Sequence, residues 1–156
     1  MTWLPRNLLV LGFSLAAFSS LFTGRAVSQN ISLDPTYGSK LLLPGFMPNP
    51  FVKQVVSGGP IQTQLGGVRA WVANAPDFKV YYTASSHPLT IRVESAVDTT
   101  LLVNLPDGTW VADDDSGGNL NPLVKFDKPQ SGQYDIWVGT FGKENAPAVL
   151  KITELK

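Results

Sequence analysis

The segment from residue 113 to 121, Asp-Asp-Asp-Ser-Gly-Gly-Asn-Leu-Asn, holds the densest chemistry of this 156-residue chain. Three adjacent carboxylates repel one another unless they are solvated or share a cation. The two glycines let the backbone curl, so that oxygens spaced two residues apart converge on a hard cation that takes roughly six to eight oxygen ligands. The segment therefore indicates a calcium site.

Counted from Asp113, the spacing matches a calcium loop only in part, because Asp115, Asn119 and Asn121 take its third, seventh and ninth positions. The twelfth position is Val124 instead of a bidentate glutamate, and no helix signals flank the segment. The alternative is a solvated loop whose Asp and Asn side chains hydrogen-bond their own backbone. Additional calcium ligands would have to come from elsewhere, such as Asp98, Asp107 or Asp127.

The same segment contains Asp115-Ser116-Gly117-Gly118, which resembles the nucleophile sequence of trypsin-like serine proteases. A catalytic triad needs a base, but the single histidine, His87, lies between Ser86 and Pro88 in a setting typical of a turn. Three acids beside the serine also disfavour a developing oxyanion. We therefore interpret residues 115–118 as a decoy and predict no catalytic residue, and a lone histidine without cysteine argues against zinc.

Strands must position this segment, since apolar and polar side chains alternate along much of the chain. Phe78, Val80 and Tyr82 share one face of a predicted strand. The same alternation predicts strands at 89–94, 134–138 and 150–153, and weaker patterns predict others at 40–43, 51–56, 68–73, 99–104, 109–112 and 122–126. The pattern predicts an all-β fold, a single jelly-roll-like antiparallel β-sandwich of about 8–10 short strands.

Residues 1–28 have the pattern of a secretory signal peptide, with Arg6 before an apolar stretch and a small-residue cut site ahead of Gln29. A retained transmembrane anchor is the alternative, but the apolar stretch is shorter than the ~20 residues that cross a bilayer. We expect a Pro/Gly-rich arm with edge strands at 29–60 and the sandwich at 61–156. The predicted location is the periplasm or the extracellular medium.

Signal cleavage would leave ten Lys and Arg against twelve Asp and Glu, a net charge of −2. This balance argues against nucleic acid and anionic membrane surfaces as partners. The chain has no cysteine, so its stability has to come from packing and from any bound ion.

Aromatic residues are numerous enough to form a binding face of the kind seen on carbohydrate modules. The alternative is that they fill the core. Trp137 is the candidate ligand-binding residue, because it falls on the outward phase of its strand. The aromatic set is Trp71, Tyr81, Tyr82, Trp110, Trp137 and Phe141.

Residues 98–141 resemble the bacterial pre-peptidase C-terminal domain, with Asp-Thr-x-Leu at 98–101, Pro-Asp-Gly at 106–108, Asp-Asp-Asp-Ser-Gly-Gly at 113–118 and Ser-Gly-x-Tyr at 131–134. The resemblance implies a jelly-roll-like sandwich of secreted proteins, often appended to proteases, with some calcium-binding relatives. It adds Asp98 to the acidic positions, and we expect this module to depart from the family's usual arrangement, in which a catalytic domain is attached. The full set of predicted metal ligands is Asp98, Asp113, Asp114, Asp115, Asn119 and Asn121.

These observations favour an exported, non-catalytic binding or accessory module with calcium as a structural ion. Its partner would be an unknown protein or polysaccharide, with no nucleic acid and no membrane insertion after signal cleavage. The alternative is a periplasmic or envelope structural protein whose arm, residues 29–60, pairs with the sheet edge of a partner. A carbohydrate-binding module and a serine hydrolase have weaker support.

Overall fold

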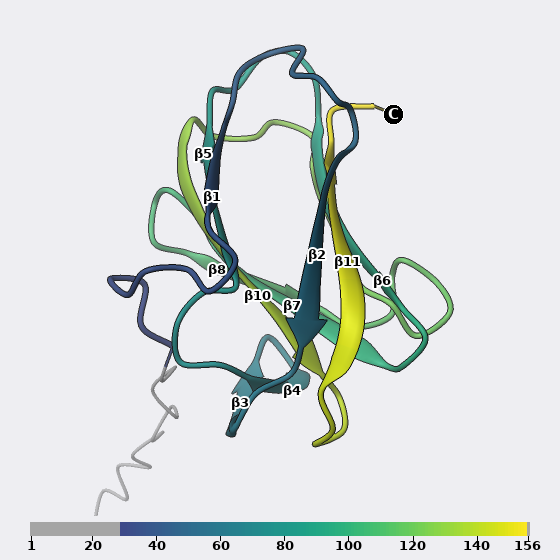
Figure 1. The fold of residues 1–156 in the computed structure, drawn as a ribbon. Helices are drawn as coiled ribbons and strands as arrows, with labels where there is room; N and C mark the ends of the chain where they lie inside the picture. The colour runs from purple at the N-terminus through teal and green to yellow at the C-terminus, as the bar shows by residue number, and fades with distance from the viewer. Residues whose placement is uncertain (1–28, 156) are drawn as a thin grey trace, which may run out of the picture.

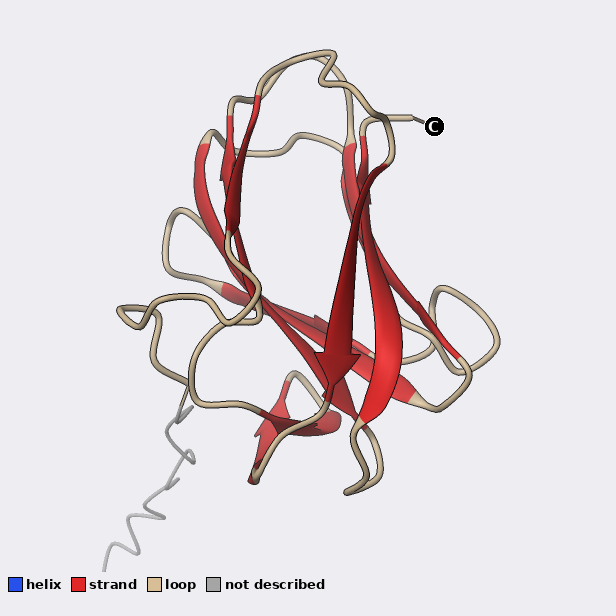
Figure 2. Cartoon of the chain, viewed as in Figure 1, coloured by secondary structure: helices blue, strands red, loops and turns tan. Residues whose placement is uncertain are grey.

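The computed structural model describes residues 29–155, so the predicted signal peptide lies outside the described residues (Figure 1). Two β-sheets pack face to face, and within this range there is no helix (Figure 2). The prediction of an all-β sandwich is confirmed. None of the described segments is a helix long and apolar enough to span a membrane.

The larger sheet is built around β10 (Gly132–Thr140). One edge of β10 pairs first with β5 (Phe78–Tyr82) and then, at Thr140, with β4 (Val68–Val72). Its other edge pairs with β7 (Thr99–Asn104). The sheet is completed by β1 (Ser39–Leu42), β3 (Ile61–Leu65) and β8 (Trp110–Asp113).

The smaller sheet has the order β2-β11-β6-β9. Its strands are β2 (Phe51–Ser57), β6 (Leu89–Ser95), β9 (Leu123–Phe126) and β11 (Ala146–Thr153). Apolar side chains of both sheets meet between them, and Val80, Ile91, Ile136 and Leu150 are among the fully buried ones. Burial of alternate side chains from both sheets is what stabilises a sandwich without disulfides.

Every strand predicted from alternation is present, but the described residues form eleven strands, one more than the upper end of the prediction. The additional strand is β3, which lies between two glycine-rich breaks. Gly66 and Gly67, with φ of 57° and 90°, make the tight turn that joins β3 to β4 as a hairpin. The prediction of a wholly antiparallel fold is wrong in one place, because β1 pairs parallel with β5.

The β3–β4 hairpin folds over the outer face of the larger sheet and makes a second, smaller core. Ala70 and Val72 of the hairpin pack with Leu102 and Trp137, and Trp137 has no exposed surface. Trp137 points away from the main core, as its phase predicts, but the hairpin covers that face. The prediction that Trp137 lies exposed for ligand binding is therefore wrong, since alternation gives the side of a sheet and not what covers it.

The arm supplies an edge strand to each sheet. β2 pairs with β11 from Phe51 to Ser57, and β1 pairs with β5. The Tyr37 hydroxyl accepts a hydrogen bond of 3.1 Å from the backbone N–H of Val56, which links the two edges. Residues 29–60 are thus hydrogen-bonded into the sandwich along most of their strands.

Two buried carboxylates close the body of the sandwich. Glu154 accepts hydrogen bonds from the Tyr82 hydroxyl at 2.6 Å and from the Gly45 N–H at 2.8 Å. Asp77 lies where β10 changes partner from β5 to β4, and its Oδ2 accepts the otherwise unpaired N–H of Val138 at 2.7 Å. Burial raises the pKa of Asp77 to about 7.

Candidate functional site

Loops and the β3–β4 hairpin gather at one end of the sandwich, which we call the loop end. It comprises residues 69–71, 96–98, 113–121 and 141–145. The Phe141 N–H donates to the Asp98 carbonyl at 3.1 Å, and the Thr99 N–H donates to the Leu120 carbonyl at 3.0 Å. These bonds bring Asp98 next to the acidic segment 113–121, as the calcium prediction requires.

Asp113 holds the acidic segment in shape. Its carboxylate accepts the Ser116 hydroxyl at 2.6 Å, the Ser116 N–H at 3.0 Å and the Leu123 N–H at 2.9 Å. A carboxylate that accepts local backbone N–H groups acts as a loop cap. Such local bonding is the solvated-loop alternative that the sequence left open. The Ser116 hydroxyl donates its hydrogen to the Asp113 carboxylate.

Asn121 anchors the far end of the segment. Its Oδ1 accepts the Ser95 N–H at 2.9 Å and the Thr99 hydroxyl at 2.8 Å, while its Nδ2 donates to the carbonyls of Ser95 and Asn119 at 3.2 Å and 3.0 Å. All the hydrogen-bonding positions of this buried amide are therefore used within the fold. Asn119 itself has a left-handed backbone, with φ of 56°, in the turn before it.

The three other acids, Asp98, Asp114 and Asp115, have side chains that take no part in the hydrogen bonds shaping the segment. Partial burial raises the pKa of Asp98, and the negative charges of Asp115 and Asp114 raise it further. The described residues contain no group of three or more His, Cys, Asp or Glu side chains placed to hold a metal. The calcium site stays a prediction, and two of its six proposed ligands, Asp113 and Asn121, are already bonded to the protein.

His87, the single histidine, lies in the connection between β5 and β6. Its Nδ1 is 3.1 Å from the Ser85 hydroxyl. Ser116 is in the connection between β8 and β9 and donates to Asp113. The described contacts therefore do not join Ser116 to His87.

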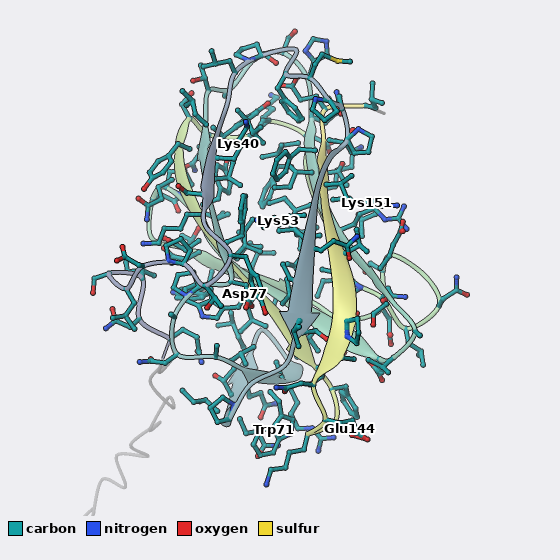
Figure 3. All side chains as sticks on the ribbon, in the orientation of Figure 1. Lys40, Lys53, Trp71, Asp77, Glu144 and Lys151 are labelled. Carbon is teal, nitrogen blue, oxygen red and sulfur yellow. The ribbon has the colours of Figure 1, made fainter. Side chains whose placement is uncertain are left out.

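A face of aromatic rings and cations lies on the other side of the loop end. The Arg69 guanidinium carbon is 4.3 Å from the centre of the Phe141 ring, and the Lys143 Nζ is 5.4 Å from the centre of the Trp71 ring. We call these four residues the aromatic-cation face. Figure 3 shows Trp71 at the extremity of the molecule, close in view to Glu144.

The two faces of β4 explain why the aromatic-cation face lies at the surface. Ala70 and Val72 point inward and cover Trp137, so Arg69 and Trp71 point outward. Phe141 and Lys143 join them from the β10–β11 loop, and the Phe141 side chain is 39 % exposed. The hairpin thus closes a core with one face and presents rings and charges with the other.

A small cavity of about 160 Å³ lies at the same end, lined by Val97, Asp98, Thr140, Gly142 and Glu144. The loop end therefore combines basic and aromatic groups with acidic ones over a short distance. Trp71 and Phe141 belong to the aromatic set that the sequence singled out. The sequence could place Arg69 beside Trp71 by alternation, but it could not bring Lys143 from a distant loop.

No protein-family model and no curated protein match the chain. Among solved structures, the chain is similar to the pre-peptidase C-terminal domain of collagenase from Bacillus anthracis, at 10 % identity and a TM-score of 0.47, covering 80 % of this chain and 100 % of that one. This is a domain of the kind that residues 98–141 resemble.

The chain is also similar to PliG of Aeromonas hydrophila, a periplasmic inhibitor of g-type lysozyme. The identity is 14 % and the TM-score 0.39, with 78 % of this chain and 98 % of that one covered. Shared folds at such identities do not carry ligands from one protein to another. What this chain binds has to be argued from its own residues.

Proposed function

We propose that the chain is an exported, non-catalytic module that binds a protein partner through its aromatic-cation face. The observation that carries the proposal is the placement of the exposed Arg69 over the exposed Phe141 ring and of the exposed Lys143 ammonium over the half-buried Trp71 ring. None of the ion pairs among the described residues includes Arg69 or Lys143, so their charges are open to a partner. Neither the Arg69 nor the Lys143 side chain belongs to a hydrophobic core.

The composition of the face favours a protein partner with acidic groups. Tryptophan and arginine are enriched among the residues that contribute most to protein interfaces, where a ring buries apolar area and a guanidinium pairs with a carboxylate. A polysaccharide would need a bare ring to stack on. Here Arg69 and Lys143 occupy positions over the rings, and displacing each would cost about 0.5–1 kcal/mol.

Assembly through the arm has less support. β1 and β2 already pair with β5 and β11 of the same chain, so one edge of each arm strand is hydrogen-bonded within its own sandwich. A partner would have only the short outer edges left to pair with.

Site-specific photocross-linking in the native host tests the proposal. A benzophenone amino acid replaces Phe141 in one variant and, as the control, Val56 of β2, which is 46 % exposed. We expect a discrete adduct from position 141, lost on adding Arg69→Glu, and none from position 56. An adduct formed equally from both positions, or from position 56 alone, would contradict the proposal.

Export is a separate part of the proposal and rests on residues 1–28 of the sequence. Mass analysis of the chain recovered from the envelope or medium of its host tests it. The expected N-terminus is Gln29. An uncut chain that begins at Met1 would contradict signal cleavage.

The calcium prediction is independent of the partner. The supporting observation is the mutual repulsion of Asp98, Asp114 and Asp115, which a cation would relieve. We expect the melting temperature to rise in millimolar calcium relative to excess chelator, and Asp115→Asn to reduce the rise. Equal melting temperatures would refute the prediction.

A further inference from the structure

A second cavity lies on the outer face of the larger sheet, away from the loop end. Its volume is about 330 Å³, and Asn104, Gln133 and Asp135 contribute polar groups to its wall. Ile31, Leu105 and Pro106 make an apolar rim. The polar residues lie on neighbouring strands, since Asp135 of β10 is directly opposite Asn104 of β7.

Asp135 is a charged group that the fold has buried at this cavity. Its side chain is 3 % exposed, and that of Lys79, whose Nζ is 3.5 Å away, is 10 % exposed. The Gln133 amide donates to both carboxylate oxygens at 2.9 and 3.0 Å, and Lys79 donates to the Ile31 carbonyl at 2.8 Å. A buried ion pair often stabilises a fold no better than a well-packed apolar pair would. The pair is therefore weak evidence for a purely stabilising role of Lys79 and Asp135.

The charges select a neutral ligand. Asp135 is the charged residue of the wall, and Lys79 balances it from outside the wall. A cationic ligand would therefore compete with the Lys79 ammonium for the carboxylate, and an anionic ligand would meet the buried carboxylate. Hydrogen-bond acceptors dominate the polar wall. Asp135 has lone pairs beyond those that Gln133 uses, and both Asn104 amide hydrogens point to the carbonyls of Gly108 and Thr109. A ligand rich in hydroxyl groups would supply the hydrogens that this wall can accept.

The position of the cavity favours a saccharide over a peptide as its ligand. A peptide that adds to a sheet needs free backbone groups at an edge. This cavity lies over the face of β10, whose two edges pair with β5 and β7 at this level. Recognition here has to use side chains, which suits hydroxyl groups on a sugar ring.

An exposed aromatic ring lies on the strand next to the cavity wall, although it does not line the cavity itself. Tyr81 is directly opposite Gln133 in the pairing of β5 with β10, and it is 44 % exposed. The cation–aromatic contacts among the described residues involve Phe78, Phe141 and Trp71, but not Tyr81. The C–H face of a sugar can therefore stack on Tyr81, in contrast to the covered rings of the loop end.

We propose that this cavity is a binding site for a neutral saccharide, with Asp135 and Gln133 bonding the hydroxyl groups and Tyr81 stacking on the ring. The site goes beyond the proposed protein-binding function and does not rest on it. With both sites, one small module would hold a protein partner against a polysaccharide.

Nuclear magnetic resonance of the full processed chain tests the site, with cello-, malto-, xylo- and chito-oligosaccharides added separately at millimolar concentration. We expect at least one of them to shift the side-chain amide signals of Asn104 and Gln133 and to leave residues 141–145 unmoved. Shifts at Asn104 and Gln133 produced only by polygalacturonate or by a neutral peptide would overturn the proposal. So would the absence of shifts with all four oligosaccharides.

Variants sharpen the test with the oligosaccharide that gives the largest shifts. Lys79→Met with Asp135→Leu removes both charges together, so that neither is left buried without its partner, and we expect affinity to fall roughly tenfold or more. Arg92→Met with Glu94→Leu removes a more exposed ion pair on the other sheet; it is the control for the loss of two charges and should bind like the parent chain.

Gln133→Ala and Tyr81→Ala keep the test decisive if the paired variant does not fold. Gln133 is half-buried and Tyr81 exposed, so neither change opens the core. We expect each to weaken saccharide binding severalfold, because each removes one contact to the sugar. Parental affinity in both variants would overturn the proposal.

Discussion

The carboxylates of the sandwich body and those of the loop end are used in opposite ways. Asp77 and Glu154 in the body are buried, and each accepts hydrogen bonds that close the fold. Asp98, Asp115 and Glu144 at the loop end are half-buried or exposed, and Asp98 is repelled by its acidic neighbours. The first group stabilises the structure, whereas the second leaves charge available to a ligand.

The largest effect that tests this contrast is the change in the free energy of unfolding with pH that the titration of Asp77 causes. Its pKa is about 7 in the folded chain against an ordinary value of 3.8, so the folded state binds more protons between these values. The contribution to stability is therefore complete below pH 3.8 and is lost as pH rises through about 7. The loss is on the order of 4 kcal/mol, from about 1.4 kcal/mol for each pKa unit.

Asp77→Asn keeps an acceptor for the Val138 N–H and removes the titration. We expect urea unfolding at about pH 5 and pH 8 to show a steep fall in stability for the parent chain and a much smaller fall for the variant. Burial also raises the pKa of Asp135, which leaves a residual slope of the same sign. An equally steep fall in the variant would show that Asp77 is not the buried acid responsible.

The next effect compares one glutamate from each region. Glu154→Ala leaves the buried Tyr82 hydroxyl and the Gly45 N–H without their acceptor and should cost about 3 kcal/mol in the free energy of unfolding. Glu144→Ala, at the exposed loop end, should change it by less than about 0.5 kcal/mol. Chemical denaturation measures both, and equal losses would remove the distinction between the regions.

A smaller effect is expected within the acidic segment itself. Asp113→Ala removes the acceptor of the Ser116 and Leu123 N–H groups and should destabilise the chain by about 1–2 kcal/mol. Asp114→Ala, one residue on, should be nearly neutral. Thermal melts of the two variants check this, and a larger loss for Asp114 would contradict the cap assigned to Asp113.

Sequence alternation was sufficient for the sandwich because each strand buries one face. It predicted the inward set of Phe78, Val80 and Tyr82 correctly. It missed β3, whose glycine pair it took for a break instead of a hairpin turn. It also missed the parallel pairing of β1, which depends on where a long connection ends and not on local pattern.

The candidate sites were harder to predict, since they depend on contacts between distant segments. Asp113 and Asn121 were singled out as metal ligands by residue type, and only the fold shows their oxygens bonded to backbone groups. Trp137 was assigned to solvent by phase, and only the packing of the hairpin shows that it is covered. Alternation with Phe78 and Val80 puts Lys79 on the outer face of β5, and only the fold shows its bond to the Ile31 carbonyl of the arm.

The smallest effect concerns the repulsion at the loop end. Asp114→Asn with Asp115→Asn removes two negative charges near Asp98, so the pKa of Asp98 should fall toward its ordinary value. A carboxyl titration followed by nuclear magnetic resonance measures this directly. An unchanged pKa would mean that burial alone perturbs Asp98.

The central claim is that the loop end binds a partner through its uncompensated cations. The most direct test is the yield of the position-141 adduct in a chain that carries Lys143→Glu with Arg69→Glu, measured together with its free energy of unfolding. We predict that the adduct is lost while stability falls by no more than about 1–2 kcal/mol, the worth of two exposed cation–aromatic contacts. An undiminished adduct from a stably folded variant would contradict the account.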